Sequence, residues 1–121
     1  MRQSEAACRL IPDEADFLTF LGLAQYRVGR YREAVATLTQ ADRIHRDYWN
    51  GSPFPKDLAF LALARHRCGQ TDQARAILGE LRETVKRPQW VREGHMLGYL
   101  REAEVIELDA AFPAEPFAPI P

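Results

Sequence analysis

The chain has 121 residues, of which 46% are hydrophobic and 27% charged, and its formal net charge is −1. This length allows one compact domain with a modest core. A near-neutral charge gives no electrostatic basis for binding nucleic acid or an anionic membrane. No charge-free stretch before the C-terminal tail is long enough to cross a bilayer. Cys8 and Cys68 have no partner spacing, which is typical of thiols in a reducing compartment, so we expect a cytoplasmic protein.

Two helices are predicted in the first third of the chain. Asp13 is a suitable N-cap for the first helix, which should end at Gly29, because glycine readily adopts the positive φ of a helix C-terminus. The second helix is predicted from Tyr31 to His45. Its inner face should carry apolar residues at helical spacing: Ala34, Val35, Leu38, Ala41 and Ile44.

The remainder of the chain reads as a loop, a second helix pair, a final helix and a tail. The loop is predicted over Tyr48–Pro55, where Asn50-Gly51 and two prolines interrupt regular structure. Helices should follow over 56–68 and from the capping residue Thr71 to near Val85. After Pro88, a last helix within 90–108 should bury one face, formed by Met96, Tyr99, Leu100, Ala103 and Ile106. The tail over 109–121 contains four prolines and is predicted to be disordered or extended.

The two predicted helix pairs are copies of one another. Residues 18–38 and 58–78 align at an offset of 40, and ten of these 21 positions are identical. Average residue usage gives roughly one or two such matches by chance. The identical pairs are Leu18/Leu58, Phe20/Phe60, Leu21/Leu61, Leu23/Leu63, Ala24/Ala64, Arg27/Arg67, Gly29/Gly69, Ala34/Ala74, Ala36/Ala76 and Leu38/Leu78. A unit of this kind cannot bury its apolar face alone, so it must stack on a neighbour.

The repeated segment resembles a tetratricopeptide repeat (TPR). The resemblance rests on the pattern L-G-x-A-x-Y-x-x-G-x-Y-x-E-A, which runs from Leu21 to Ala34, and on Leu38 and Ala41. Gly69, Ala74 and Leu78 carry it into the second copy. The family's repeat is 34 residues long, and the six extra residues here fit the predicted loop. More loosely, the stretch from Leu58 resembles the TPR tails of large bacterial kinase or WD-repeat proteins.

The resemblance implies an all-α fold: a TPR-like α-solenoid of antiparallel helix pairs with a C-terminal capping helix. Its parts would be a half-repeat at 1–12, units at 13–46 and 56–87, an inserted loop at 47–55, a capping helix at 88–108 and the tail at 109–121. The half-repeat would be the second helix of a truncated preceding unit. Ala6, Ala7 and Leu10 would then form an unfinished apolar edge, which implies weak self-association.

The family's function implies protein–protein interaction through a concave groove lined by the first helix of each unit. The groove residues would be Asp16, Thr19, Leu23, Tyr26 and Arg27, followed by Lys56, Ala59, Leu63, His66 and Arg67. Among these we single out Leu23, Tyr26, Arg27, Leu63, His66 and Arg67 as partner-binding candidates. Leucine at positions 23 and 63, where one TPR subclass has asparagine, disfavours that subclass's binding of C-terminal carboxylates. An apolar peptide with some acidic residues is the alternative ligand.

Two aromatic residues of the loop allow two interpretations. Trp49 and Phe54 could tuck into the seam between the units, or they could contact a partner. The alternative for the groove residues is that they only pack and solvate their helices. The whole chain would then be a structural or regulatory tail of a larger, kinase-linked protein with no ligand of its own.

The sequence offers no pattern typical of an enzyme, a metal site or a cofactor site. His66 and Cys68 have no further ligand at metal-binding spacing, because His45 and His95 lie far from them in the sequence. The glycines occur singly, so they form no phosphate-binding loop. Capping of a helix accounts for the carboxylates at 13, 14 and 16. We therefore expect no catalytic residue, no metal and no cofactor.

Overall fold

The computed structural model describes residues 2–91 and 94–111, and these residues contain helices and no strand. The helices are α1 (Arg2–Arg27), α2 (Tyr31–Tyr48), α3 (Pro55–Arg67), α4 (Thr71–Thr84), α5 (Pro88–Val91), α6 (Gly94–Ala103) and α7 (Val105–Ala111). Among the described helices, none is both long and apolar enough to traverse a bilayer.

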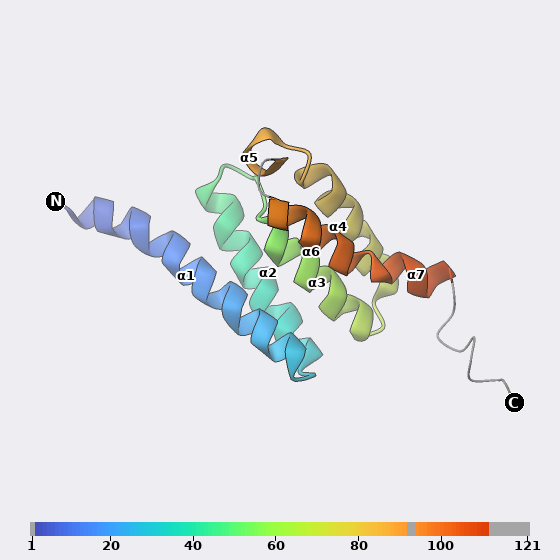
Figure 1. The fold of residues 1–121 in the computed structure, drawn as a ribbon. Helices are drawn as coiled ribbons and strands as arrows, with labels where there is room; N and C mark the ends of the chain where they lie inside the picture. The colour runs from blue at the N-terminus through green and yellow to red at the C-terminus, as the bar shows by residue number, and fades with distance from the viewer. Residues whose placement is uncertain (1, 92–93, 112–121) are drawn as a thin grey trace, which may run out of the picture.

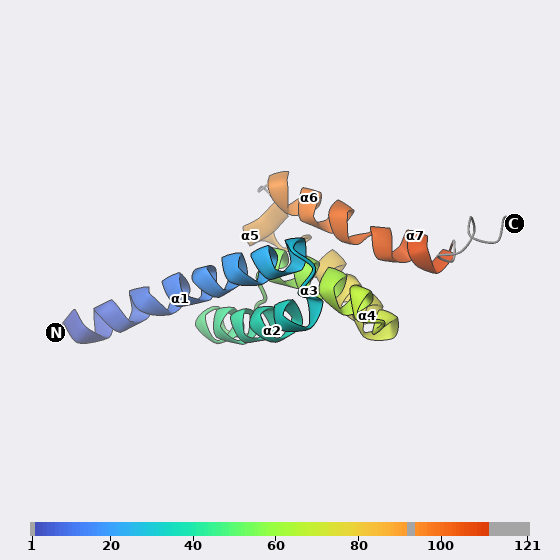
Figure 2. The ribbon, with the colours of Figure 1, turned by 90° about the horizontal axis from the view of Figure 1, so that it is seen from below.

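The helices pack in sequential antiparallel pairs (Figure 1). α1 lies along α2, α3 lies along α4, and α2 packs against α3, which joins the two pairs. α6 lies across α3, and α7 continues toward α4. Seen from below, α2 and α4 lie on one side of the molecule, and α1 and α6 lie on the other (Figure 2). In both views the first turns of α1 project beyond the other helices.

Two glycines make the tight turns inside the pairs. Gly29 and Gly69 have φ of +86° and +84°, which confirms the prediction that Gly29 ends its helix at positive φ. The cap predicted at Thr71 is wrong, because Thr71 is the first residue of α4 and Gln70 precedes it without a capping hydrogen bond. The Thr71 hydroxyl lies 3.2 Å from Nδ1 of His66 instead.

α1 is longer than predicted. It is one helix from Arg2 to Arg27, so the expected boundary at Asp13, with a separate helix over 1–12, is wrong. The helix continues through Pro12, although proline inside a helix removes a backbone hydrogen bond and crowds the preceding turn. α2 also runs three residues beyond the predicted end at His45, and Pro55 already belongs to α3, so the loop between them is 49–54.

The C-terminal part contains three helices where one was predicted. α5, α6 and α7 replace the single capping helix expected over 88–108. The chain bends at Glu104, which lies 3.3 Å from Nε of Arg82 on α4, and Glu107 lies 3.4 Å from Arg75 on the same helix. α7 includes residues 109–111, which were expected in the tail. The rest of the predicted tail, 112–121, lies outside the described residues.

The core follows the repeat. Ala34 and Ala74 are fully buried at equivalent positions, as are Leu38 and Leu78. α3 is the most enclosed helix, because α1, α2, α4 and α6 all pack on it. Met96, Ala103 and Ile106 are buried, and Tyr99 and Leu100 pack against the same core, so the predicted inner face of the C-terminal part is confirmed.

Gly22 marks the closest approach of α1 to α2. A Cβ atom added at Gly22 would lie 2.5 Å from Cγ of the buried Leu38. We predict that Gly22→Ala destabilises the fold by about 1–3 kcal/mol, because Leu38 would have to leave its place in the packed core. Urea denaturation measures this change.

Gly98→Ala is the matched control for this substitution. Gly98 also lies within a helix, but a Cβ atom added there meets nothing within 4 Å. Alanine should therefore stabilise α6 by up to about 1 kcal/mol through its higher helix propensity. If both substitutions stabilise the protein, the predicted contact between α1 and α2 at Gly22 is contradicted.

Candidate functional site

A cleft of about 270 Å³ lies between α1 and α6, over the start of α3. α1 contributes one wall, α6 contributes the opposite wall, and α3 with the residue before it contributes the floor. The lining residues are Asp16, Thr19, Phe20, Phe54, Lys56, His95, Met96 and Tyr99. The cleft thus combines aromatic rings with one ammonium and one carboxylate group.

The ammonium group of Lys56 is the main charged feature of the cleft. Its Nζ atom lies 4.8 Å from the ring centre of Phe20 and 5.6 Å from that of Tyr99. These contacts hold the cation between the two walls, since aromatic faces attract positive charge. Within the described part of the chain, Lys56 makes no hydrogen bond and no ion pair. Phe20 is 62% exposed, although it is a large apolar side chain.

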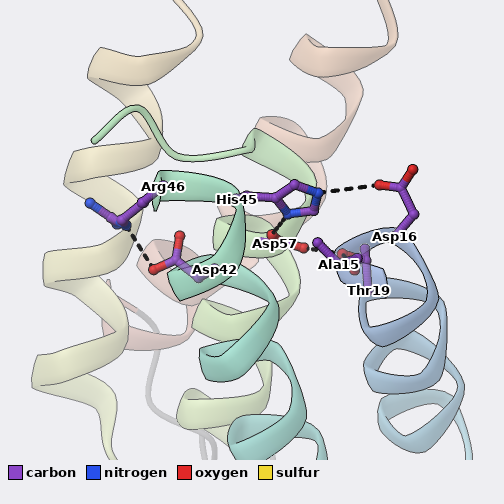
Figure 3. A network of polar contacts seen from close by, with 7 residues as sticks. All are labelled: Ala15, Asp16, Thr19, Asp42, His45, Arg46 and Asp57. Atoms are coloured by element: carbon purple, nitrogen blue, oxygen red, sulfur yellow. Dashed lines mark hydrogen bonds and ion pairs between the residues drawn. The ribbon is translucent and has the colours of Figure 1, made fainter. Parts of the chain in front are cut away.

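A buried polar network adjoins this cleft, with which it shares Asp16 and Thr19. Figure 3 shows the network. Asp57, which is 0% exposed, accepts a hydrogen bond from the Thr19 hydroxyl and lies 2.6 Å from Nδ1 of His45. The other ring nitrogen of His45, Nε2, lies 3.2 Å from Oδ1 of Asp16. One histidine on α2 therefore links a buried carboxyl group on α3 to an exposed one on α1.

Burial and hydrogen bonding set the protonation of this network. Burial raises the pKa of Asp57 above its ordinary value, and the hydrogen bonds from His45 and Thr19 offset only part of that rise. Burial alone would lower the pKa of His45. The hydrogen bond and negative charge of Asp57, followed by those of Asp16, outweigh burial, so the pKa of His45 lies above its usual 6.5. The pair thus retains a proton on His45 to higher pH than a free histidine would.

Aromatic rings cover the histidine from the side of the loop. Trp49 stacks on His45 at 5.1 Å with the planes 7° apart, and Phe54 packs against the same ring at 4.9 Å. Trp90 of α5 contacts both Trp49 and Phe54. Trp49 and Phe54 therefore occupy the seam, which is the first of the two interpretations from the sequence. Phe54 also reaches the floor of the cleft.

A second polar bridge fixes α2 against α4. Arg46 lies 2.8 Å from Asp42, one turn earlier on α2, and 2.8 Å from Glu80 on α4 (Figure 3 shows the first contact). Burial raises the pKa of Asp42, although Arg46 partly opposes this effect. The network at His45 and this bridge both lie near the C-terminal end of α2, so that end has polar contacts with α1, α3 and α4.

The predicted groove residues fall into two groups. Asp16, Thr19 and Lys56 line the cleft. The others lie toward the opposite ends of α1 and α3, where Tyr26 contacts the rings of Tyr31 and Phe60, and Arg67 lies 5.6 Å from the Tyr31 ring. Arg27 is exposed, Leu23 is half-buried, and His66 contacts Thr71. Leu63 is buried in the core at 3% exposure, so it forms no part of an open groove.

Sequence reasoning missed the α6 wall and the buried network. His95, Met96 and Tyr99 were not predicted to face α1, because the position of the final helix does not follow from the repeat. The network did leave a signal at the offset of 40. Phe17 corresponds to Asp57, Thr19 to Ala59, and His45 to Val85. At each of these three positions, a polar residue in one copy corresponds to an apolar residue in the other.

The histidine of the network is enclosed. His45 is 1% exposed and is covered by Trp49, so a substrate could not reach either ring nitrogen in this arrangement. In the part of the chain that the structure describes, no three potential metal ligands come together. No protein-family model, curated protein or solved structure was found to match this chain.

The raised pKa of His45 predicts a pH-dependent stability. The folded protein binds the His45 proton more tightly than the unfolded chain does. This contribution to stability is complete below pH 6.5 and is lost as the pH rises through the folded-state pKa. We predict that the free energy of unfolding of the wild type falls as the pH rises above 6.5. In His45→Gln the fall should be smaller, because the contribution from the His45 proton is absent. Urea denaturation at a series of pH values measures it.

His66→Gln is the control, because His66 lies at the surface end of α3 and does not take part in the network. It should keep the wild-type dependence on pH. An unchanged pH dependence in His45→Gln would show that the proton on His45 does not contribute to stability.

Proposed function

We propose that this protein is a TPR-like interaction module that binds a segment of a partner protein in the cleft between α1 and α6. One observation carries the proposal: the ammonium group of Lys56 lies between Phe20 and Tyr99 without a carboxylate partner among the described residues. A bound segment with an acidic group would supply that partner. It would also cover the exposed ring of Phe20, whose exposure in the free protein is unfavourable.

The fold gives this proposal its architectural support. Sequential antiparallel helix pairs, glycine turns at equivalent positions and matched buried alanines at 34 and 74 are the features expected of a TPR-like array. In such an array the first helices of the units form the binding face. Here that face is formed by α1 and α3, and α6 lies beside α3 as a first helix of a further unit would.

The cleft also defines the chemistry of the segment. The aromatic rings and the Met96 side chain that line the cleft can contact an apolar residue of the bound segment. The Lys56 ammonium can pair with a neighbouring aspartate or glutamate of that segment. Asp16 at the α1 edge can accept a hydrogen bond from a backbone or side-chain donor of the same segment. We place the module in the cytoplasm, which is in keeping with the free thiol of Cys68.

A displayed library of random peptides, selected on the immobilised protein, tests the proposal. The enriched peptides should share an acidic residue next to an aromatic or aliphatic one. Lys56→Glu should weaken their binding by about tenfold or more, as expected when a charge-assisted contact becomes a repulsion. Fluorescence anisotropy with a labelled peptide gives the dissociation constants. Glutamate at the start of α3 is compatible with the helix dipole, so the fold should persist.

Lys86→Glu provides the matched charge reversal at a surface away from the cleft. Lys86 is exposed and lies 3.4 Å from Glu83 after the end of α4. This variant should bind the selected peptides as the wild type does. Equal binding to the Lys56 variant, or selection of no acidic motif, would contradict the proposed site.

A further inference from the structure

α1 presents a line of apolar side chains to solvent on the face opposite the core. The line consists of Phe17, Leu21, Ala24 and Val28, and Phe17 and Val28 are 62% and 71% exposed. On the other side of the helix, Ala15, Thr19 and Gly22 are buried against the body of the protein. Spacings of four, three and four residues keep the exposed line on one stripe of the helix, as in the seam of a two-helix coil.

The internal repeat shows what kind of surface covers this stripe. At the offset of 40, Phe17, Leu21 and Ala24 correspond to Asp57, Leu61 and Ala64 of α3, all of which are buried. Asp57 contacts His45 of α2, so this face of α3 lies against a helix. The equivalent face of α1 is apolar, and none of the described helices covers it.

Head-to-tail stacking of copies does not supply the missing helix. The helix of one copy that would have to cover α1 of the next is α4, which corresponds to α2 in the repeat. In this chain α6 and α7 already pack on α4, and Glu104 and Glu107 form ion pairs with Arg82 and Arg75 there. Among the described helices, α1 of a second copy exposes the most large apolar side chains, which are Phe17, Phe20, Leu21 and Val28.

The charges beside the stripe favour an antiparallel arrangement. Asp16 and Arg27 are 11 residues apart, about three turns, so they lie on the same flank of α1. An antiparallel partner places Asp16 of each copy near Arg27 of the other, and it pairs Phe17 with Val28 and Leu21 with Ala24. In a parallel pair, Asp16 of one copy and Arg27 of the other would lie about three turns apart along the helix axis, so these charges could not pair.

We propose that two copies of this chain associate through an antiparallel pairing of their α1 helices along Phe17, Leu21, Ala24 and Val28. This contact lies on the outer face of α1, beside the cleft, and Asp16 borders both surfaces.

Analytical ultracentrifugation of the full chain over a range of concentrations tests the pairing. The wild type should show a monomer–dimer equilibrium. Phe17→Glu should lower the association constant by about tenfold or more, since it removes apolar burial and adds a charge to the contact between the two α1 helices. Val28→Glu should act in the same way. Leu108→Glu is the control, because Leu108 is 58% exposed on α7. This variant should associate like the wild type.

Disulfide trapping tests the orientation. In chains that carry Cys8→Ser and Cys68→Ser, a Phe17→Cys protein mixed with a Val28→Cys protein should form mixed disulfides under mild oxidation. A parallel pair would instead join Phe17→Cys to itself. The proposal is overturned by a wild type that stays monomeric at about 100 μM, a concentration at which even weak specific contacts are populated. Loss of association in Leu108→Glu would overturn it as well, because the contact would then involve α7.

Discussion

Burial of the carboxyl group of Asp57 constrains the arrangement of the first three helices. A buried carboxyl group is costly unless it is fully hydrogen-bonded, and removing one partner of a buried pair costs about 3–5 kcal/mol. The partners here come from two other helices, Thr19 on α1 and His45 on α2. The start of α3 therefore has one favourable position relative to α1 and α2. Apolar contacts alone are not directional and would allow a wider range of positions.

The cleft follows from the same constraint. Neighbouring residues on a helix point about 100° apart, so when Asp57 faces α2, Lys56 must face a different surface. That surface is the space between α1 and α6, where the Lys56 ammonium meets the rings of Phe20 and Tyr99. The rings of Trp49, Phe54 and Trp90 keep water from His45 and hold the loop against α5. Ser52 adds polar contacts to that end, since it accepts hydrogen bonds from Arg87 and Gln89.

The parts of the fold that depend on local chemistry were predictable from the sequence. Gly29 and Gly69 mark the turns because few other residues tolerate their positive φ, and Ala34 and Ala74 mark helix contacts because larger side chains would not fit. The unbroken α1 was not predictable from local signals, since Pro12-Asp13 is also a typical start of a helix. The α6 wall depends on packing between residues far apart in the sequence, and no periodic pattern encodes that position.

The two copies of the repeat differ in polarity at a position where they meet. In the second copy Asp57 takes the position of the exposed Phe17, and it makes a specific polar contact with His45. Asp16 belongs both to the cleft, which it lines, and to the polar network, in which it contacts His45. A ligand that drew Asp16 away would leave His45 with Asp57 alone, and the pKa of His45 would fall. Linkage is reciprocal, so protonation of His45 and engagement of Asp16 by a ligand must oppose each other.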